Sequence, residues 1–198
     1  MPAIGKILVK ILRHSAVKEW GLEIGTDGYI KLDHILKHPR ISKLHEFKDI
    51  DLEKIKQCVT ECKKKRMQLD IRNGIYYIRA TQGHSIQSIQ PDKLLNPIGI
   101  EFTDNVIHGT YLKSIGSILK NGLSRMDRNM IHFTNHTPKS NKVISGMRGS
   151  SQVLIYIDLP LAIGDGIKFW ISHNGVILSY GNKDGCLEPK YFKKIVYL

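Results

Sequence analysis

Apolar side chains near the start of the chain recur every three or four residues, which is the spacing of one face of a helix. This stripe predicts a first helix that buries one face. It ends at the pair Arg13-His14, one of which must lie at the edge of the buried face because neighbouring helical residues point about 100° apart. The stripe consists of Ile4, Ile7, Leu8, Ile11 and Leu12.

A turn, a short strand and two helices are expected next. Residues 26–28 are Thr-Asp-Gly, a turn signal, and residues 29–32 alternate like a strand. Asp33 is expected to cap a helix that runs through Leu36 and stops before Pro39. For the helix that follows, either Asp49 or Asp51 can be the capping residue, and the apolar spacing over residues 52–59 is helical.

The first half ends in a predicted β-hairpin. Strand-like runs at residues 67–72 and 75–80 flank Asn73-Gly74, a dipeptide that accepts the positive φ angles of a type I′ turn. Helix, strand, helix, helix and hairpin is the order of a winged helix, a small module that commonly sets a helix and its hairpin against nucleic acid. Other small α+β units share this order.

The second half is predicted to be mostly β with one or two helices. Residues 87–99 contain Pro91 and Pro97 among polar residues and indicate a boundary. Helical spacing from Leu112 to Leu119 ends at Asn121-Gly122, a C-cap signal. The chain as a whole is therefore expected to be α+β. The β-prone runs are residues 98–102, 106–108, 131–134, 153–159, 167–172 and 176–180.

The net charge of the chain indicates which class of partner it binds. Thirty Lys and Arg against eighteen Asp and Glu give the 198-residue chain a formal net charge of +12. The excess is +7 over residues 1–95 and +5 over residues 96–198. We therefore expect a polyanion to contact both halves of a folded surface, and acidic protein partners are disfavoured.

Several classes of protein drop out. The cysteines, Cys58, Cys62 and Cys186, are odd in number and lack zinc-finger spacing, so the sequence favours an intracellular, reducing compartment without a disulfide scaffold. Cys58 and Cys62 could share a metal at i, i+4, although ordinary helix-face residues have the same spacing. No apolar run approaches the roughly 18 residues of a membrane-spanning helix. The motifs GxGxxG, GxxxxGK[ST], HExxH and GxSxG do not occur.

Four places concentrate cationic, imidazole and hydroxyl side chains. Arg13-His14 follows the first helix, and residues 77–85 end the hairpin in a polar corner whose guanidinium, imidazole, hydroxyl and N–H groups suit a phosphate. His108-Gly109-Thr110 leads a strand into a helix, where it can contact ribose hydroxyls or an amide. Arg148 lies in a Gly- and Ser-rich loop ahead of a strand. Taken alone, each of these places is as typical of residues that have only a structural role as of a functional site.

Taken together, these places resemble the RNA 2′-phosphotransferase family, the tRNA 2′-phosphotransferases or KptA-like enzymes. The resemblance covers nearly the whole chain, and short motifs become specific when so many occur in the family's order. The motifs are Leu12-Arg13-His14, Asp27-Gly28-Tyr29, Lys31-Leu32-Asp33, Ile78 to Ser85, His108-Gly109-Thr110, Ile131-His132-Phe133, Gly146-Met147-Arg148, Ile155 to Asp158, Asp165 to Phe169 and Asn174 to Leu178.

The resemblance implies a winged-helix RNA-binding lobe over residues 1–92 and an ADP-ribosyltransferase-like, NAD-binding lobe over residues 93–198. It implies a transferase that consumes NAD⁺ and needs no metal. In this family the internal 2′-phosphate of an RNA, as at a tRNA splice junction, attacks C1″ of the nicotinamide ribose and expels nicotinamide. The ribose O2″ then attacks the phosphorus, which leaves RNA with a 2′-OH and ADP-ribose 1″,2″-cyclic phosphate.

The same resemblance assigns roles. The catalytic set is Arg13, His14, Arg79 and Arg148, the last stabilising charge in the second step. The polar corner supplies the expected substrate-binding residues, Gln82, His84 and Ser85. The expected cofactor-binding residues are His108, Gly109, Thr110, His132 and Val176. Position 176 carries a catalytic Glu in many protein-modifying relatives of this lobe, so its valine argues against protein ADP-ribosylation.

The sequence differs from the family's usual motifs at two positions, and two alternative functions stay open. Thr81 stands where the family usually has Asn, and Met130 where it often has His; both are expected to tune RNA or cofactor contacts. One alternative is an ADP-ribosyltransferase that stops after the first step and caps a terminal phosphate of a nucleic acid. The other is a winged-helix nucleic-acid-binding protein without catalysis, which has no need of three separated arginines at one phosphate. The expected partner is RNA bearing an internal 2′-phosphate, with no membrane association and a monomeric chain.

Overall fold

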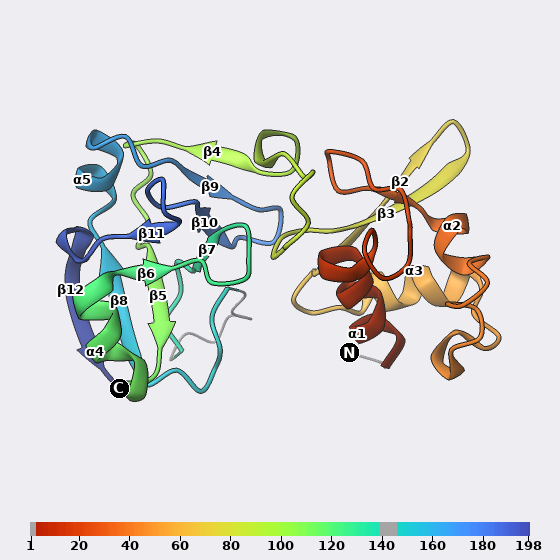
Figure 1. Cartoon of the computed structure of the whole chain (residues 1–198), viewed down its shortest axis with the longest axis horizontal. Helices are drawn as coiled ribbons and strands as arrows, with labels where there is room; N and C mark the ends of the chain where they lie inside the picture. The colour runs from red at the N-terminus through yellow and green to blue at the C-terminus, as the bar shows by residue number, and fades with distance from the viewer. Residues whose placement is uncertain (1–2, 139–145) are drawn as a thin grey trace. The chain divides into compact units, whose positions relative to one another are not determined.

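The computed structural model describes residues 3–138 and 146–198. The chain divides into two compact units, Met1–Leu94 and Leu95–Leu198 (Figure 1). Each mixes helices with antiparallel strands, as the expected α+β class requires. The two units are described separately below.

Unit 1 packs helices against a small antiparallel sheet. The sheet has the strand order β1-β3-β2. Its helical and strand elements are α1 (Ala3–Lys10), the π-helical segment η1 (Ile11–Ser15), β1 (Ile30–Lys31), α2 (Leu32–Leu36), the 3₁₀ turn η2 (His45–Phe47), α3 (Leu52–Thr60), β2 (Met67–Arg72), β3 (Ile75–Ala80) and the 3₁₀ turn η3 (Pro91–Lys93).

The hairpin of β2 and β3 has the predicted bounds and the predicted turn. Asn73 and Gly74 have φ angles of 50° and 76°, as a type I′ turn requires. Pairing of Gln68 with Arg79 and of Asp70 with Tyr77 fixes the register. Because side chains alternate along a strand, these four residues share one face of the sheet. The opposite face carries Met67, Leu69, Ile78 and Ala80 and joins the core of unit 1.

Capping residues and apolar spacing in the sequence predicted most of the helices of unit 1. Asp51 caps α3 by accepting a hydrogen bond from the Lys54 N–H at 2.8 Å, which selects it over Asp49. The expected cap at Asp33 is wrong. Helix α2 begins at Leu32, with Lys31 as its N-cap, so Asp33 lies inside the first turn; its carboxylate forms a salt bridge with Lys37 at 2.7 Å, one turn along the helix.

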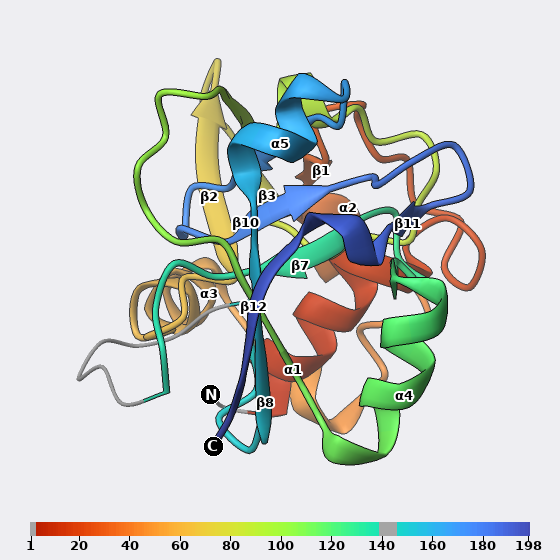
Figure 2. The ribbon, with the colours of Figure 1, turned by 90° about the vertical axis from the view of Figure 1, so that its left-hand side faces the viewer.

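Unit 2 is built on two larger antiparallel sheets, with strand orders β4-β9-β10-β7 and β12-β8-β5, and the small pair β11-β6. Figure 2 shows β5, β8 and β12 side by side, with α4 along one flank. The elements are β4 (Asn96–Ile98), β5 (Ile107–Thr110), α4 (Leu112–Asn121), β6 (Leu123–Ser124), β7 (Ile131–Phe133), β8 (Val153–Ile157), α5 (Leu159–Gly164), β9 (Phe169–Ile171), β10 (Ile177–Ser179), β11 (Cys186–Leu187), the 3₁₀ turn η4 (Pro189–Tyr191) and β12 (Phe192–Tyr197).

One predicted strand of unit 2 is wrong. Residues 98–102 do not continue β4, because the chain turns there: the Phe102 N–H donates to the Gly99 carbonyl at 3.1 Å, and the Gly99 N–H donates to the Glu101 carboxylate at 3.2 Å. The other predicted runs each contain a strand, and Gly122 ends α4 with φ of 85°. Strands β6, β11 and β12 and helix α5 were not predicted.

Each unit has its own hydrophobic core. In unit 1, Leu8, Ile11 and Leu12 of the first helical run pack against Ile55 of α3 and Ile78 of β3. The core of unit 2 contains the buried residues Phe133, Ile155, Phe169 and Ile177 from its strands. Within residues 3–138 and 146–198, no helix has both the length and the apolar composition needed to cross a bilayer.

Candidate active site

The first helical run changes its winding at the predicted cationic pair. Residues 11–15 form a π-helical segment, in which the Ala16 N–H donates to the Ile11 carbonyl at 2.9 Å. π-Helical turns are rare and often lie at functional sites, because the wider turn changes the direction of the side chains that follow. Leu12 stays in the core, whereas Arg13 is half-buried and His14 is exposed.

The polar corner after β3 is attached to this π-helical segment. The Ser85 N–H donates to the Arg13 carbonyl at 2.9 Å, and the His14 imidazole Nδ1 is 3.0 Å from the Ser85 hydroxyl. At Gly83, where φ is 86°, an added Cβ would lie 3.2 Å from Cζ of Arg13, so the guanidinium lies directly against this glycine. The motifs at 13–14 and 79–85 are therefore in direct contact, although about 70 residues separate them along the chain.

Arg79 is held by neutral acceptors. Its Nε and one terminal nitrogen donate to the Gln68 side-chain oxygen at 3.1 and 2.9 Å, and the other terminal nitrogen donates to the Asp27 backbone carbonyl at 3.1 Å. The Tyr29 ring packs against the guanidinium, with Cζ 4.5 Å from the ring centre. Neither acceptor carries a charge, so these bonds fix Arg79 without offsetting its positive charge.

His84 shows that the cationic residues of unit 1 converge. Its side chain is 5% exposed. Burial, together with the nearby positive charges of Arg13, His14 and Arg79, lowers the pKa of His84 to about 3. The imidazole is thus neutral at physiological pH. Its Nε2 is buried without a hydrogen-bond partner among the described residues, so it has hydrogen-bonding capacity that a polar ligand can satisfy.

Unit 1 therefore contains a site with a local excess of positive charge. Arg13, His14, Arg79 and the neutral His84 come from the π-helical segment, β3 and the corner loop. Guanidinium groups present paired N–H donors that match two oxygens of a phosphate. A phosphate monoester is the ligand that this chemistry favours.

In unit 2, two histidines are oriented by backbone carbonyls. His108 Nδ1 donates to the His132 carbonyl at 2.9 Å, and His132 Nδ1 donates to the Met130 carbonyl at 2.9 Å. Burial lowers the pKa of His108, although the bond to His132 opposes the shift. A neutral ring that donates through Nδ1 keeps a lone pair on Nε2 and can accept a hydrogen bond there.

Two other residues expected to contact a cofactor have packing roles in this structure. A Cβ at Gly109 would lie 2.2 Å from the Met147 sulfur and 2.7 Å from the Ser151 hydroxyl. On the side where a Cβ would stand, the space beside Gly109 is thus occupied by Met147. Val176 is fully buried, and its backbone N–H and carbonyl both bond the Ser172 hydroxyl. Thr110 is buried beside Gly109 at the end of β5.

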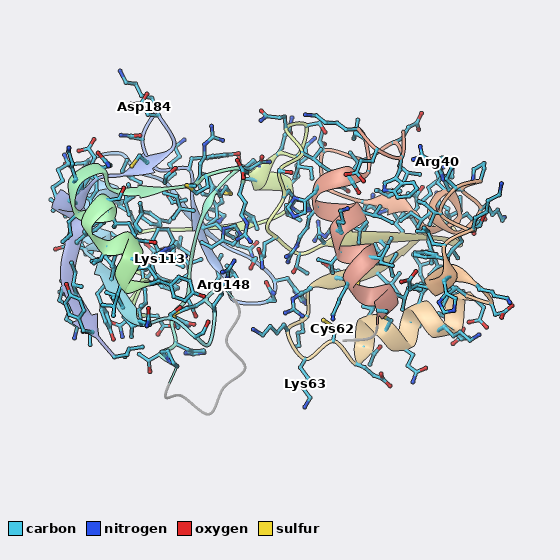
Figure 3. The ribbon with its side chains drawn as sticks, turned by 60° about the horizontal axis from the view of Figure 1, so that its bottom comes forward. Arg40, Cys62, Lys63, Lys113, Arg148 and Asp184 are labelled. Carbon is cyan, nitrogen blue, oxygen red and sulfur yellow. The ribbon has the colours of Figure 1, made fainter. Side chains whose placement is uncertain are left out.

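Arg148 lies in an open hollow of about 460 Å³ in unit 2. Tyr111, Leu112, Lys113 and Gln152 line the hollow with it, and Figure 3 labels Lys113 and Arg148. The Tyr111 hydroxyl is 3.0 Å from the Ser150 hydroxyl, and hydrogen bonds from Ser150 and Arg148 lower the pKa of Tyr111. Arg148 is exposed.

The comparisons with known proteins agree on one family. The model of the RNA 2′-phosphotransferase, Tpt1 / KptA family matches residues 2–181. The chain belongs to this family. It is 42% identical over 192 residues to a putative tRNA 2′-phosphotransferase of Schizosaccharomyces pombe, an alignment that covers 96% of this chain and 50% of the relative. The chain therefore spans half the length of that relative.

Two further relatives are covered more completely. The tRNA 2′-phosphotransferase 1 of Homo sapiens is 38% identical over 198 residues, which cover 98% of this chain and 75% of the human protein. The tRNA 2′-phosphotransferase of Saccharomyces cerevisiae is 40% identical over 183 residues, which cover 89% of this chain and 77% of the yeast protein.

Both departures from the phosphotransferase motifs keep the local hydrogen bonding. The Thr81 hydroxyl donates to the Lys65 carbonyl at 3.0 Å, a bond that an asparagine amide can also donate. Met130 holds His132 through its backbone carbonyl, which any residue supplies.

The structure adds residues to the phosphotransferase motifs that sequence reasoning missed. Gln68 and the Asp27 carbonyl position Arg79. In unit 2, burial and the neighbouring charge of Arg148 lower the pKa of Arg128, so a second arginine stands near Arg148. Pairing of β2 with β3 could have placed Gln68 opposite Arg79, because the predicted turn fixes that register. The described residues contain no cluster of three or more His, Cys, Asp or Glu placed to hold a metal.

Proposed function

We propose that this protein is an NAD⁺-dependent RNA 2′-phosphotransferase that removes an internal 2′-phosphate from RNA, with tRNA, the substrate in its relatives' names, as the natural substrate class. The observation that carries the proposal is the group of Arg13, His14 and Arg79 around the buried, neutral His84. A dianionic phosphate is the ligand whose charge this group offsets.

The two units are proposed to divide the work. Helices α1 and α3 and the β2–β3 hairpin have the order of a winged helix, which suits unit 1 to RNA binding. The antiparallel sheets of unit 2 carry His108, Thr110 and His132, and we assign the NAD⁺ of an ADP-ribosyltransferase-like lobe to them. The neutral His108 supports this assignment, because its Nε2 can accept a hydrogen bond from an amide or a hydroxyl.

The residues of unit 1 account for the first step. Arg13 and Arg79 hold the 2′-phosphate in line with C1″ of the nicotinamide ribose, so that a phosphate oxygen bonds to C1″ as the bond to nicotinamide breaks. Nicotinamide leaves as a neutral molecule, because its ring nitrogen takes the electron pair of that bond. The neutral His84 adds a hydrogen-bonding group without repelling the phosphate's arginine partners.

The second step is a transesterification at phosphorus. The ribose O2″ loses its proton and bonds to phosphorus, while the RNA 2′-oxygen leaves and takes up a proton. His14, held through Nδ1 by the Ser85 hydroxyl, is placed to carry a proton. We assign to Arg148 the stabilisation of the negative charge that builds up on the phosphate oxygens. The products are RNA with a 2′-OH and ADP-ribose 1″,2″-cyclic phosphate.

One experiment separates this function from the alternatives. A short RNA with a single radiolabelled internal 2′-phosphate is incubated with the protein, with and without NAD⁺. We expect the label to leave the RNA as ADP-ribose cyclic phosphate only when NAD⁺ is present. Label that stays on an enlarged RNA would indicate an ADP-ribosyltransferase that stops after the first step. Label that stays on unchanged RNA in both reactions would overturn the enzymatic assignment and favour a nucleic-acid-binding protein.

A further inference from the structure

A second hollow lies beside the cationic group in unit 1. Its volume is about 280 Å³, just below the roughly 300–1,000 Å³ of sites for drug-sized ligands. Its walls include Asp27, Tyr29, Lys31, Arg72 and Tyr77. Arg72 and Tyr77 have no role in the proposed reaction. The space suits one flat ring system better than a whole nucleotide.

The hollow is an aromatic and guanidinium surface on the polar face of the sheet. Arg72 Cζ lies 4.4 Å from the centre of the Tyr29 ring and 5.2 Å from that of the Tyr77 ring. Two carboxylates fix this guanidinium, with Asp27 and Asp70 each 2.9 Å from one of its nitrogens. Planar groups held in this way stack on nucleobases, and Tyr and Arg are the side chains that do so in single-stranded RNA complexes.

The hollow and the cationic group share residues. The Tyr29 ring that meets Arg72 at 4.4 Å also meets Arg79 at 4.5 Å. Asp27 contributes its carbonyl to Arg79 and its carboxylate to Arg72. An RNA whose phosphate bonds Arg79 therefore has this hollow within reach of a neighbouring nucleotide.

Charge favours a base over a second phosphate in the hollow. Among the residues that line the hollow, Glu23 and Asp27 balance Lys31 and Arg72, so the hollow has no formal excess of positive charge to attract a phosphate. Burial opposes ionisation of Asp27, but the hydrogen bonds from Arg72 and from the Tyr29 N–H lower its pKa below the usual value, so it stays negative. A negative oxygen repels phosphate but accepts hydrogen bonds from the N–H groups on the edge of a base.

We propose that this hollow binds the nucleobase next to the 2′-phosphorylated nucleotide, stacked on Tyr77 and Arg72, an inference that rests on the proposed function. The subsite would bind RNA through one base beside the phosphate. Stacking reads no particular sequence, whereas the carboxylates favour a base that carries N–H donors on its edge.

The test uses uridine-rich RNA with an internal 2′-phosphate and one 2-aminopurine, placed on the 5′ or the 3′ side of the modified nucleotide. Binding is followed by 2-aminopurine fluorescence without NAD⁺, so the readout does not need turnover. We expect the fluorescence to change on binding at one of the two positions. The change should disappear in Tyr77→Leu, which keeps apolar bulk, and persist in Tyr77→Phe. Tyr197→Leu, at a residue 60% exposed on β12 of unit 2, is the matched control.

Affinity provides the second readout. Replacing the flanking base by an abasic residue should weaken binding to the unmodified protein by about 5- to 150-fold, the range of one stacked base. In Tyr77→Leu the abasic RNA should bind as well as the intact RNA. Equal binding of intact and abasic RNA by the unmodified protein, or equal losses in both proteins, would overturn the proposal. Failure of the proposed function would give a different result: the RNA would still bind, but its radiolabelled 2′-phosphate would stay on the RNA in the presence of NAD⁺.

Discussion

Substitution of Gln68 tests how Arg79 is positioned in the proposed phosphate site. Its side-chain oxygen accepts two hydrogen bonds from Arg79, at 3.1 and 2.9 Å. Gln68→Leu removes both and puts in their place an apolar side chain of similar size, which a strand tolerates. Hydrogen bonds to charged groups contribute about 1.5–3 kcal/mol. If that energy holds Arg79 against the transition-state phosphate, kcat/KM should fall about ten- to hundredfold.

The companion variant separates position from charge. Gln68→Glu keeps an oxygen acceptor at the same place but pairs Arg79 with a negative charge. Arg79 should stay in position while its attraction for the phosphate is offset, and the new carboxylate should repel the phosphate directly. We expect weaker binding of 2′-phosphorylated RNA, seen as a higher KM, and a partial recovery as salt screens the repulsion.

The assay is steady-state release of labelled phosphate product from a 2′-phosphorylated RNA, with thermal unfolding to verify that each variant folds. Gln57→Leu is the control, because the Gln57 side chain is exposed on α3 and donates a hydrogen bond to the nearby Glu61 carboxylate at 2.7 Å, away from Arg79. Its kcat/KM should match that of the unmodified protein. Wild-type kcat and KM in Gln68→Glu would show that the neutrality of the acceptor is irrelevant, and the reasoning would fail.

Three further outcomes follow from individual sites. Arg148→Ala should let ADP-ribosylated RNA accumulate as a slower gel band, and loss of turnover without that band would contradict its assignment to the second step. The pKa of His84 is about 3 in the folded chain against an ordinary 6.5, so below pH 6.5 the unfolded chain gains a proton that the folded chain does not. The free energy of unfolding should therefore fall from pH 6.5 towards 3 by up to about 1.4 kcal/mol per pH unit, and urea titrations of His84→Gln should show a smaller slope. Gly109→Ala, which meets the Met147 sulfur, should lower the free energy of unfolding by about 1–3 kcal/mol in the same assay, whereas Gly116→Ala, in open space on α4, should not.

Features that depend on nearby residues could be predicted from the sequence. The hairpin was predicted with its bounds because Asn73-Gly74 sets both the turn type and the register. The first helix and the Asp51 cap likewise depend on contacts within a few residues. Strand β12 was missed because Phe192–Tyr197 lacks clean alternation and exists through pairing with the distant β8.

The candidate site was predictable as residue types and not as an arrangement. Family resemblance named Arg13, His14 and Arg79, but no periodicity indicates the π-helical turn that changes the winding at Arg13-His14. The protonation of His84 depends on burial among three cations from distant segments. Sequence alone also cannot show that Met147 fills the space on the Cβ side of Gly109.

Two arginines of one hairpin show why those contacts matter. Arg72 and Arg79 both lie against the Tyr29 ring, yet Arg72 bonds two carboxylates and Arg79 bonds two neutral oxygens. The charge of Arg72 is thus offset, which leaves a flat stacking surface, whereas no carboxylate is hydrogen-bonded to Arg79 to offset its attraction for an anion. Sequence assigns both the same charge. The difference between their partners is the reason for proposing a base-binding position at Arg72 and a phosphate-binding position at Arg79.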